Sequence, residues 1–103
     1  MRFTWDAAKN RANQRKHDGI AFEQAVHVFR DPLRLTRQDR IEGGEERWQT
    51  IGVVHGVTVL LVAHTIREEM TSAEDEEAVE EIRIISARRT LQGASHAKGK
   101  EAL

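Results

Sequence analysis

The segment Val57–Ile66 constrains the fold most strongly, because its sequence V-T-V-L-L-V-A-H-T-I is apolar on both faces of an extended chain. A strand of this kind needs neighbours that cover both of its faces, so we expect it near the centre of a sheet. The dipeptide His55-Gly56 precedes it, and glycine tolerates the positive φ that a tight hairpin turn requires. The pattern therefore predicts a hairpin in which Arg47–Val54 is the partner strand.

Shorter patterns predict the remaining elements and an α+β class, because helices precede an antiparallel sheet. Apolar residues spaced by three and four positions indicate a helix over Ile20–Arg30, while alternation over Leu33–Gln38 indicates a half-buried strand. Gln38–Glu46 is expected to form a polar loop. Residues 1–92 are expected to form one domain and residues 93–103, which lack an apolar stripe, a flexible tail. The predicted order is β-α-α-β-β-β-β-α over Arg2–Trp5, Asp6–Lys16, Ile20–Arg30, Leu33–Gln38, Arg47–Val54, Val57–Ile66, Glu81–Ser86 and Ala87–Gln92.

The stretch Glu81–Arg89 is predicted to be a strand that leads directly into a helix capped by Ser86. Arg88 and Arg89 then fall in the first helical turn, where each cation opposes the helix dipole by a few tenths of a kcal/mol. A helix N-terminus flanked by arginines attracts anions. With Arg83 on the strand, the pattern predicts a phosphate-binding corner, and an ordinary solvated helix start is the alternative.

The charges are unevenly distributed along the chain. Eight of the 17 acidic residues fall within Glu68–Glu81, which holds no base, so the rest of the chain has an excess of bases. We expect Met70–Val79 to be a mobile acidic connection. The first helix, whose thin apolar stripe is Ala8 and Ala12, presents a basic surface to phosphates. A solvated helix face and a solubilising loop explain the same charges and remain the alternative.

Several classes of protein are disfavoured by the composition. The chain has no cysteine, so disulfides and thiolate metal sites are excluded. No apolar run reaches the roughly 20 residues of a membrane span, so we expect a cytoplasmic protein without membrane contact. The five histidines show no metal-ligand spacing, and neither a phosphate-binding glycine loop nor a nucleophile elbow is present. We expect no metal and no cofactor.

Cleavage of RNA is the chemistry that these residues still allow, because the 2′-OH of RNA supplies the nucleophile. The protein then needs a base, cations for the charged phosphorane and an acid for the leaving oxygen. His64 and Arg67 end one predicted strand, close to the last strand of the sheet, and Glu81 is the nearest carboxylate base. A structural histidine and a surface arginine remain the alternatives for these two residues. The candidate catalytic residues are His64, Arg67, Glu81, Arg83, Ser86 and Arg88, and the candidate RNA-binding residues are Lys9, Lys16, His17 and Arg89.

A series of short segments between Phe3 and Arg89 resembles the BrnT family of bacterial ribonuclease toxins from type II toxin–antitoxin modules. The resemblance implies a RelE-like fold and metal-independent RNA cleavage that blocks translation. It also implies a BrnA antitoxin with a ribbon-helix-helix DNA-binding part, whose complex with the toxin represses operator DNA. The segments are F-T-W-D-A-A-K with Asn13, Lys16-His17, F-E-Q-A, V-F-R-D-P, G-E-E-R-W with Ile51-Gly52, H-T-I-R and I-R-I-I-S-A-R, and the implied RNA site is Lys16, His17, His64, Arg67, Arg83, Ser86 and Arg88.

Three features depart from the family pattern. Ala21 stands where the family often has a capping serine, at a cost of about 1 kcal/mol. The connection Glu68–Glu81 is longer and more acidic than usual, and a glycine-containing tail replaces the usual C-terminal helix. These departures leave open two alternatives to an active toxin: a decayed toxin that binds RNA without cleaving it, and a protein-interaction module.

Overall fold

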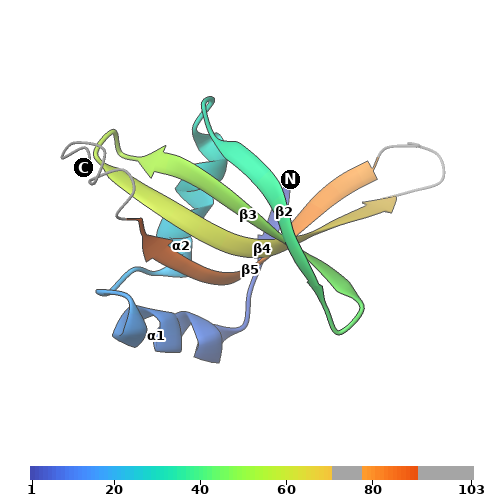
Figure 1. The fold of residues 1–103 in the computed structure, drawn as a ribbon, viewed down its shortest axis with the longest axis horizontal. Coiled ribbons are helices and arrows are strands. Elements are labelled where there is room, and N and C mark those ends of the chain that lie inside the picture. Colours follow the sequence, from blue (N-terminus) through green and yellow to red (C-terminus); the bar gives the residue numbers. More distant parts are fainter. Residues whose placement is uncertain (71–77, 91–103) are drawn as a thin grey trace.

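The computed structural model describes residues 1–70 and 78–90, which form a mixed five-stranded sheet with helices on one face (Figure 1). The strand order is β1-β5-β4-β3-β2. β1 pairs in parallel with β5, and the other neighbouring strands are antiparallel. The elements are β1 (Arg2–Thr4), α1 (Ala7–Lys16), α2 (Phe22–Ala25), the 3-10 helix η1 (Val26–Arg30), β2 (Leu35–Glu42), β3 (Glu45–Val54), β4 (Thr58–Met70) and β5 (Ala78–Arg89).

The central strand and its hairpin are confirmed. β4 lies in the middle of the sheet, and it joins β3 through His55 and Gly56, which have φ angles of 55° and 74°. The α+β class is confirmed as well. The sheet is mixed rather than antiparallel, because β1 runs parallel to β5. Among the described residues, no helix is long and apolar enough to cross a membrane.

The core lies between the sheet and the helices α2 and η1. These helices bury Phe22, Ala25 and Val28 against the side chains that β4 and β5 turn toward them. Each fully buried aliphatic side chain contributes about 1.5–3 kcal/mol to folding. The opposite face of the sheet carries no helix in the described part of the chain, and we call it the open face. The side chains of the sheet that are buried on the helix side include Leu60, Val62, Ile82 and Ile84.

The predicted helix start at Ser86 is wrong, because β5 continues as a strand to Arg89. Ala87 pairs with Val62 of β4, so the segment is already hydrogen-bonded as a strand on that side. The predicted helix-capping role of Ser86 is wrong for the same reason. The rest of the predicted C-terminal helix and the predicted tail, residues 91–103, lie outside the described residues, so the domain division remains a prediction.

Asn13 explains why β5 continues as a strand beyond its pairing with β1. The side chain of Asn13 donates to the carbonyl oxygen of Ala87 at 2.8 Å and accepts from the N–H of Ala87 at 3.1 Å. The same amide also donates to the carbonyl of Ile20 at 2.9 Å. An amide side chain on α1 therefore takes the place of a neighbouring strand and satisfies backbone groups that would otherwise be buried without partners.

The first helix packs through polar residues, so the predicted stripe of Ala8 and Ala12 is wrong. Both alanines are exposed, whereas Asn10 and Asn13 are buried. Asn10 accepts a hydrogen bond from the N–H of Phe22 at 2.8 Å, at the start of α2. This bond serves the helix start that Ala21 cannot cap with its own side chain.

Two further boundaries differ from the predictions. The segment predicted as one helix over Ile20–Arg30 is divided into α2 and η1. The predicted half-buried strand and polar loop form the hairpin of β2 and β3, in which β2 is exposed along its whole length. Gly43 and Gly44 make the turn, with φ angles of 61° and 80°.

The acidic connection is shorter than predicted. β4 extends to Met70 and β5 begins at Ala78, so both ends of the predicted connection are strand. Glu68 and Glu80 pair across these strands. Residues 71–77 lie outside the described residues.

Candidate nucleic-acid interface

Five of the six candidate catalytic residues share the open face of the sheet. Residues that are paired across neighbouring strands point to the same face. On β4, Leu61, Ala63, Thr65 and Arg67 alternate with residues that face the core, so their partners on β5 face the open side too. The pairs are Leu61 with Arg88, Ala63 with Ser86, Thr65 with Arg83, and Arg67 with Glu81.

A bulge at Ile85 produces this alignment. The pairing shifts between Ala63 and His64, so Ile85 is the extra residue on β5. Arg83 and Ser86 are three positions apart, which would place them on opposite faces of a regular strand. The bulge brings both onto the open face, where Arg88 follows at normal spacing.

Glu81 lies between two guanidinium groups at one edge of this face. Its Oε2 is 3.4 Å from Nη2 of Arg2, and its Oε1 is 4.0 Å from Nη1 of Arg67. The Glu81 side chain is only 18% exposed, whereas that of Arg67 is 71% exposed. Glu81 is thus a half-buried carboxylate flanked by two cations.

Arg47 and Arg83 converge on one carboxylate, that of Glu45. Oε1 of Glu45 lies 2.7 Å from Nη2 of Arg83 and 3.6 Å from Nη2 of Arg47. The Nε atom of Arg47 is buried and has no hydrogen-bond partner. Two guanidinium groups that share one carboxylate present donors that suit a phosphate as well, because phosphate and carboxylate oxygens are bound by the same donors.

Arg47 is not among the candidate residues that the sequence predicts. It lies in the segment G-E-E-R-W, but its position opposite β5 depends on the register of three strands. A sequence signal exists only in the alternation of Glu45, Arg47 and Gln49, which places all three on one face once β3 is known to start at Glu45.

The structure places His64 in the core, apart from the open face. Its ring is fully buried, with the ring of Phe29 edge-on at a centroid distance of 5.0 Å. Nδ1 lies 3.1 Å from the carbonyl oxygen of Thr65, which can only accept, so Nδ1 carries the hydrogen. Nε2 then accepts from the hydroxyl of Thr50 at 2.7 Å. Burial lowers the pKa of His64, so the ring is held in its neutral form.

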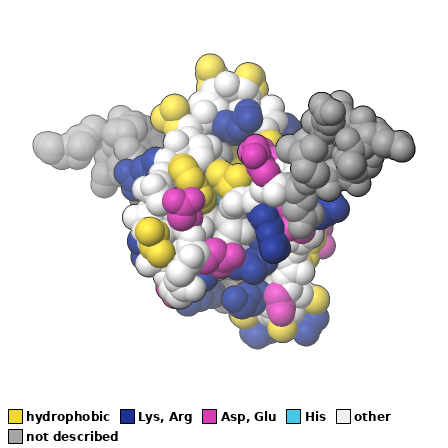
Figure 2. Space-filling model, turned by 90° about the vertical axis from the view of Figure 1, so that its right-hand side faces the viewer, with side chains coloured by type: hydrophobic (Ala, Val, Ile, Leu, Met, Phe, Trp, Pro, Cys, Tyr) yellow, Lys and Arg dark blue, Asp and Glu magenta, His cyan; other side chains and the backbone are white. Residues whose placement is uncertain are grey.

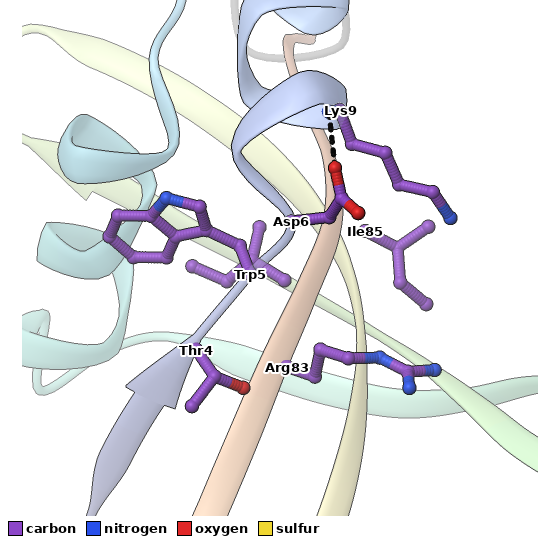
Figure 3. Close-up of a pocket in the computed structure, with 7 residues that line it drawn as sticks. Thr4, Trp5, Asp6, Lys9, Arg83 and Ile85 are labelled. Atoms are coloured by element: carbon purple, nitrogen blue, oxygen red, sulfur yellow. Dashed lines mark hydrogen bonds between the residues drawn. The ribbon is translucent and has the colours of Figure 1, made fainter.

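A hollow lies where the chain passes from β1 into α1, beside the β5 bulge (Figure 3). Asp6 caps α1 there, and its Oδ1 accepts from the N–H groups of Ala8 and Lys9 at 2.8 and 3.1 Å. The side chains of Lys9, Ile85 and Arg83 point to the same side in Figure 3. The hollow encloses about 470 Å³ and is lined by Thr4, Trp5, Asp6, Lys9, Arg83, Ile84 and Ile85.

The remaining RNA-binding candidates are Lys16, His17 and Arg89. Lys16 ends α1 and His17 is its C-cap, ten residues along the chain from the helix start. Arg89 pairs with the buried Leu60, so it faces the helix side and not the side of Arg88. The predicted corner is therefore divided, with Arg83, Ser86 and Arg88 on one face and Arg89 on the other.

Figure 2 shows one end of the molecule, where lysine and arginine side chains concentrate in the lower part and acidic side chains lie among them. Lys9 makes no ion pair with another described residue, although its charge contributes to the lowered pKa of Glu42, after the larger effects of Arg40 and Arg47. In residues 1–70 and 78–90, no three His, Asp or Glu side chains are grouped as metal ligands.

The family model for BrnT, the ribonuclease toxin of a type II toxin–antitoxin system, matches residues 5–92. The chain belongs to the BrnT family. The fold is similar to the 1.1 Å crystal structure of the Brucella abortus ribonuclease toxin BrnT, with a TM-score of 0.56 and 21% identity over 87% of this chain and 96% of that chain. No curated protein matches the sequence.

Several segments that carry the BrnT resemblance hold the fold together. Asp31, in the segment V-F-R-D-P, accepts from the N–H groups of Val53 at 2.8 Å and Leu33 at 2.9 Å, and these bonds lower its pKa. Gly52 lies so close to η1 that an added Cβ would be 3.0 Å from the carbonyl oxygen of Val28. Asn13 and His64 are likewise buried and hydrogen-bonded within the fold, whereas Arg83 and Arg88 lie on the open face.

Proposed function

We propose that this BrnT-family chain is a metal-independent endoribonuclease whose scissile phosphate binds on the open face of the sheet. The observation that supports this most strongly is the convergence of Arg47 and Arg83 on the carboxylate of Glu45. A phosphodiester that replaces this carboxylate meets two guanidinium groups. Arg67 and Arg88 extend the positive surface along the same face, and Ser86 adds a hydroxyl beside it.

The proposed reaction is an in-line transesterification. The 2′ oxygen forms a bond to phosphorus while the bond from phosphorus to the 5′ oxygen breaks, which leaves a 2′,3′-cyclic phosphate and a 5′-hydroxyl. Glu81 takes the 2′ proton, and the ammonium group of Lys9 gives a proton to the leaving 5′ oxygen. Arg83 follows Glu81 at the next open-face position of β5 and lines the same hollow as Lys9 of α1, and this placement suits a reaction whose attacking and leaving atoms are on opposite sides of phosphorus. Arg47 and Arg83 stabilise the charge of the phosphorane.

This activity makes the chain the toxin of a type II module that acts in the cytoplasm and inhibits translation by cutting RNA. Membership of the BrnT family supports an RNA substrate and an antitoxin partner. We assign the antitoxin to the BrnA type, a ribbon-helix-helix protein through which the complex binds operator DNA. Co-purification of the chain with the product of an adjacent antitoxin gene tests this assignment.

A non-catalytic RNA-binding module is the second candidate. The burial of His64 favours it, because it removes from the open face the side chain best suited to proton transfer near neutral pH. This module would bind RNA through the same arginines, with a steep dependence on salt. Strand cleavage distinguishes the two functions.

The deciding experiment incubates end-labelled RNA in EDTA with the wild-type chain, Arg83→Ala and Arg89→Ala. Arg89 is the matched control, because it lies on the same strand but faces the other side. We expect cleavage with 2′,3′-cyclic ends by the wild type and Arg89→Ala, and a loss of at least 100-fold for Arg83→Ala. RNA binding without cleavage by the wild type would establish the binding module. Equal cleavage by all three proteins would place the site elsewhere.

A further inference from the structure

The hollow beside α1 has a free hydrogen-bond acceptor that faces its interior. Oδ1 of Asp6 is occupied by two backbone N–H groups of α1. Figure 3 shows the other carboxylate oxygen turned toward Ile85 and away from the helix. The cap therefore fixes the carboxylate in place and leaves Oδ2 for a ligand. A fixed acceptor is more selective than a mobile one, because the partner must present its donor at one position.

The other residues of the hollow match the parts of a nucleotide. Lys9 and Arg83 supply positive charge for the phosphate, and Thr4 supplies a hydroxyl on the same side as Arg83. Ile85 is half-buried and gives an apolar surface against which the flat face of a base can pack. The volume of about 470 Å³ lies within the usual range for small-molecule sites.

We infer that this hollow is the subsite for the nucleotide on the leaving-group side of the scissile phosphate, and that Asp6 selects bases with an amino group. The inference rests on the proposed function, in which Arg83 holds the phosphate and Lys9 protonates the leaving 5′ oxygen. The nucleotide that carries this oxygen then lies on the Lys9 side of Arg83, next to Asp6.

The chemistry of the bases gives the direction of the selectivity. The amino groups of cytosine, adenine and guanine donate a hydrogen bond to Oδ2 of Asp6. Uracil has no amino group, and its single donor, N3–H, is flanked by two carbonyl oxygens that repel the carboxylate. When the base cannot donate to Oδ2, the carboxylate loses this hydrogen bond and has already lost the water that it displaced. The loss of a hydrogen bond to a charged group lowers the rate by about tenfold or more. We expect RNA sites with uracil in this subsite to be cleaved about tenfold more slowly.

The test replaces Asp6 with asparagine, which also caps helices well and so preserves the start of α1. The amide NH2 of asparagine places a donor in the hollow where Oδ2 was an acceptor. We therefore expect the preference against uracil to disappear or reverse, while the unfolding temperature stays unchanged. The substrates are four short RNAs that differ only in the base after the cleaved bond. Asp18→Asn is the control, because Asp18 is exposed in a positive-φ turn that asparagine tolerates.

The outcomes separate this inference from the proposed function. Cleavage by Asp6→Asn with the base preference of the wild type overturns the subsite assignment and leaves the nuclease intact. A wild-type chain that cleaves none of the four RNAs contradicts the proposed activity instead. The subsite is then judged by binding of the same four RNAs. An Asp6-dependent disadvantage of the uracil RNA supports the inference, and equal binding of all four overturns it.

Discussion

The guanidinium group of Arg83 reaches across β4 to the carboxylate of Glu45, with Nη2 and Oε1 2.7 Å apart. The two residues lie on β5 and β3, which are not neighbours in the sheet. Glu45 also contacts Arg47, so one internal anion occupies the position proposed for the phosphate. RNA must displace this carboxylate before it reaches both arginines.

Removing the charge of Glu45 is therefore expected to strengthen RNA binding. The two side chains are 48% and 44% exposed, so solvent screens the pair and its contribution is about 0.2–1 kcal/mol. Glu45→Gln should lower the dissociation constant for a non-cleavable RNA about two- to fivefold at low salt, and less at high salt. Glu46→Gln is the control, because Glu46 is the next residue and faces the other side. Weaker binding by Glu45→Gln would show that Glu45 organises the arginines instead of blocking them.

Arg47 is expected to act through the shape of its guanidinium group as well as through its charge. Arg47→Lys keeps the charge but loses the planar donors that contact two phosphate oxygens. We expect single-turnover cleavage to fall at least tenfold in this variant. Arg40→Lys provides the comparison, because Arg40 pairs with Arg47 in the register of β2 and β3 but is 62% exposed. Equal rates for the two variants would remove Arg47 from the site.

Asn13 is expected to be among the costliest positions for stability. Asn13→Ala leaves both backbone groups of Ala87 and the carbonyl of Ile20 without these partners, at about 1–3 kcal/mol for each group that water cannot reach. We expect the free energy of unfolding in urea to fall by about 2–4 kcal/mol. Gln14→Ala should change it by less than about 0.5 kcal/mol, since the side chain of Gln14 donates a long hydrogen bond of 3.3 Å to Asn10 and its backbone bond is kept in the variant. Similar values for both variants would contradict the strand-like role of Asn13.

His64 is expected to make stability fall in mild acid. Its folded-state pKa is below the unfolded value of 6.5, so below that pH the unfolded chain binds a proton more readily than the folded chain does. The stabilisation by neutral His64 is complete above pH 6.5 and declines as the pH falls toward the folded-state pKa. Urea midpoints between pH 8 and pH 5 measure this effect. His64→Gln should flatten the decline, whereas His27→Gln should retain it.

How far the sequence predicts this fold depends on whether a signal is local. The two apolar faces of Val57–Ile66 and the glycine turn before it are local, and they predict the central hairpin correctly. The helix start at Ser86 is wrong because the residues that keep β5 extended, Asn13 and Val62, are distant in the sequence. The helix and strand propensities of Ser86–Arg89 alone do not reflect the hydrogen bonds that Asn13 and β4 make to this segment.

The candidate site also combines features with a local sequence signal and features that depend on distant residues. The strand periodicity that relates Ser86 to Arg88 is visible in the sequence, but the predicted helix hid it. The bulge at Ile85, which aligns Arg83 with them, arises from pairing with β4 and has no sequence signal of its own. His64 was chosen for its chemistry, and only the packing around Phe29 and Thr50 shows that it lies in the core.

The hydrogen bonds from Asn13 to Ala87 and from β1 to β5 also bear on when the domain folds during its synthesis. Both connect the first residues of the chain to almost the last residues of the sheet, so the loop they close spans most of the domain. Contacts this distant in sequence slow folding, because their closure entropy is lost before other bonds compensate for it. A growing chain that ends before Ile82 leaves Asn13 without its partner Ala87 and the helices without Ile82 and Ile84. We therefore expect folding to be completed only after nearly the whole domain has left the ribosome, when β5 brings Arg83 and Arg88 beside the arginines of β3 and β4.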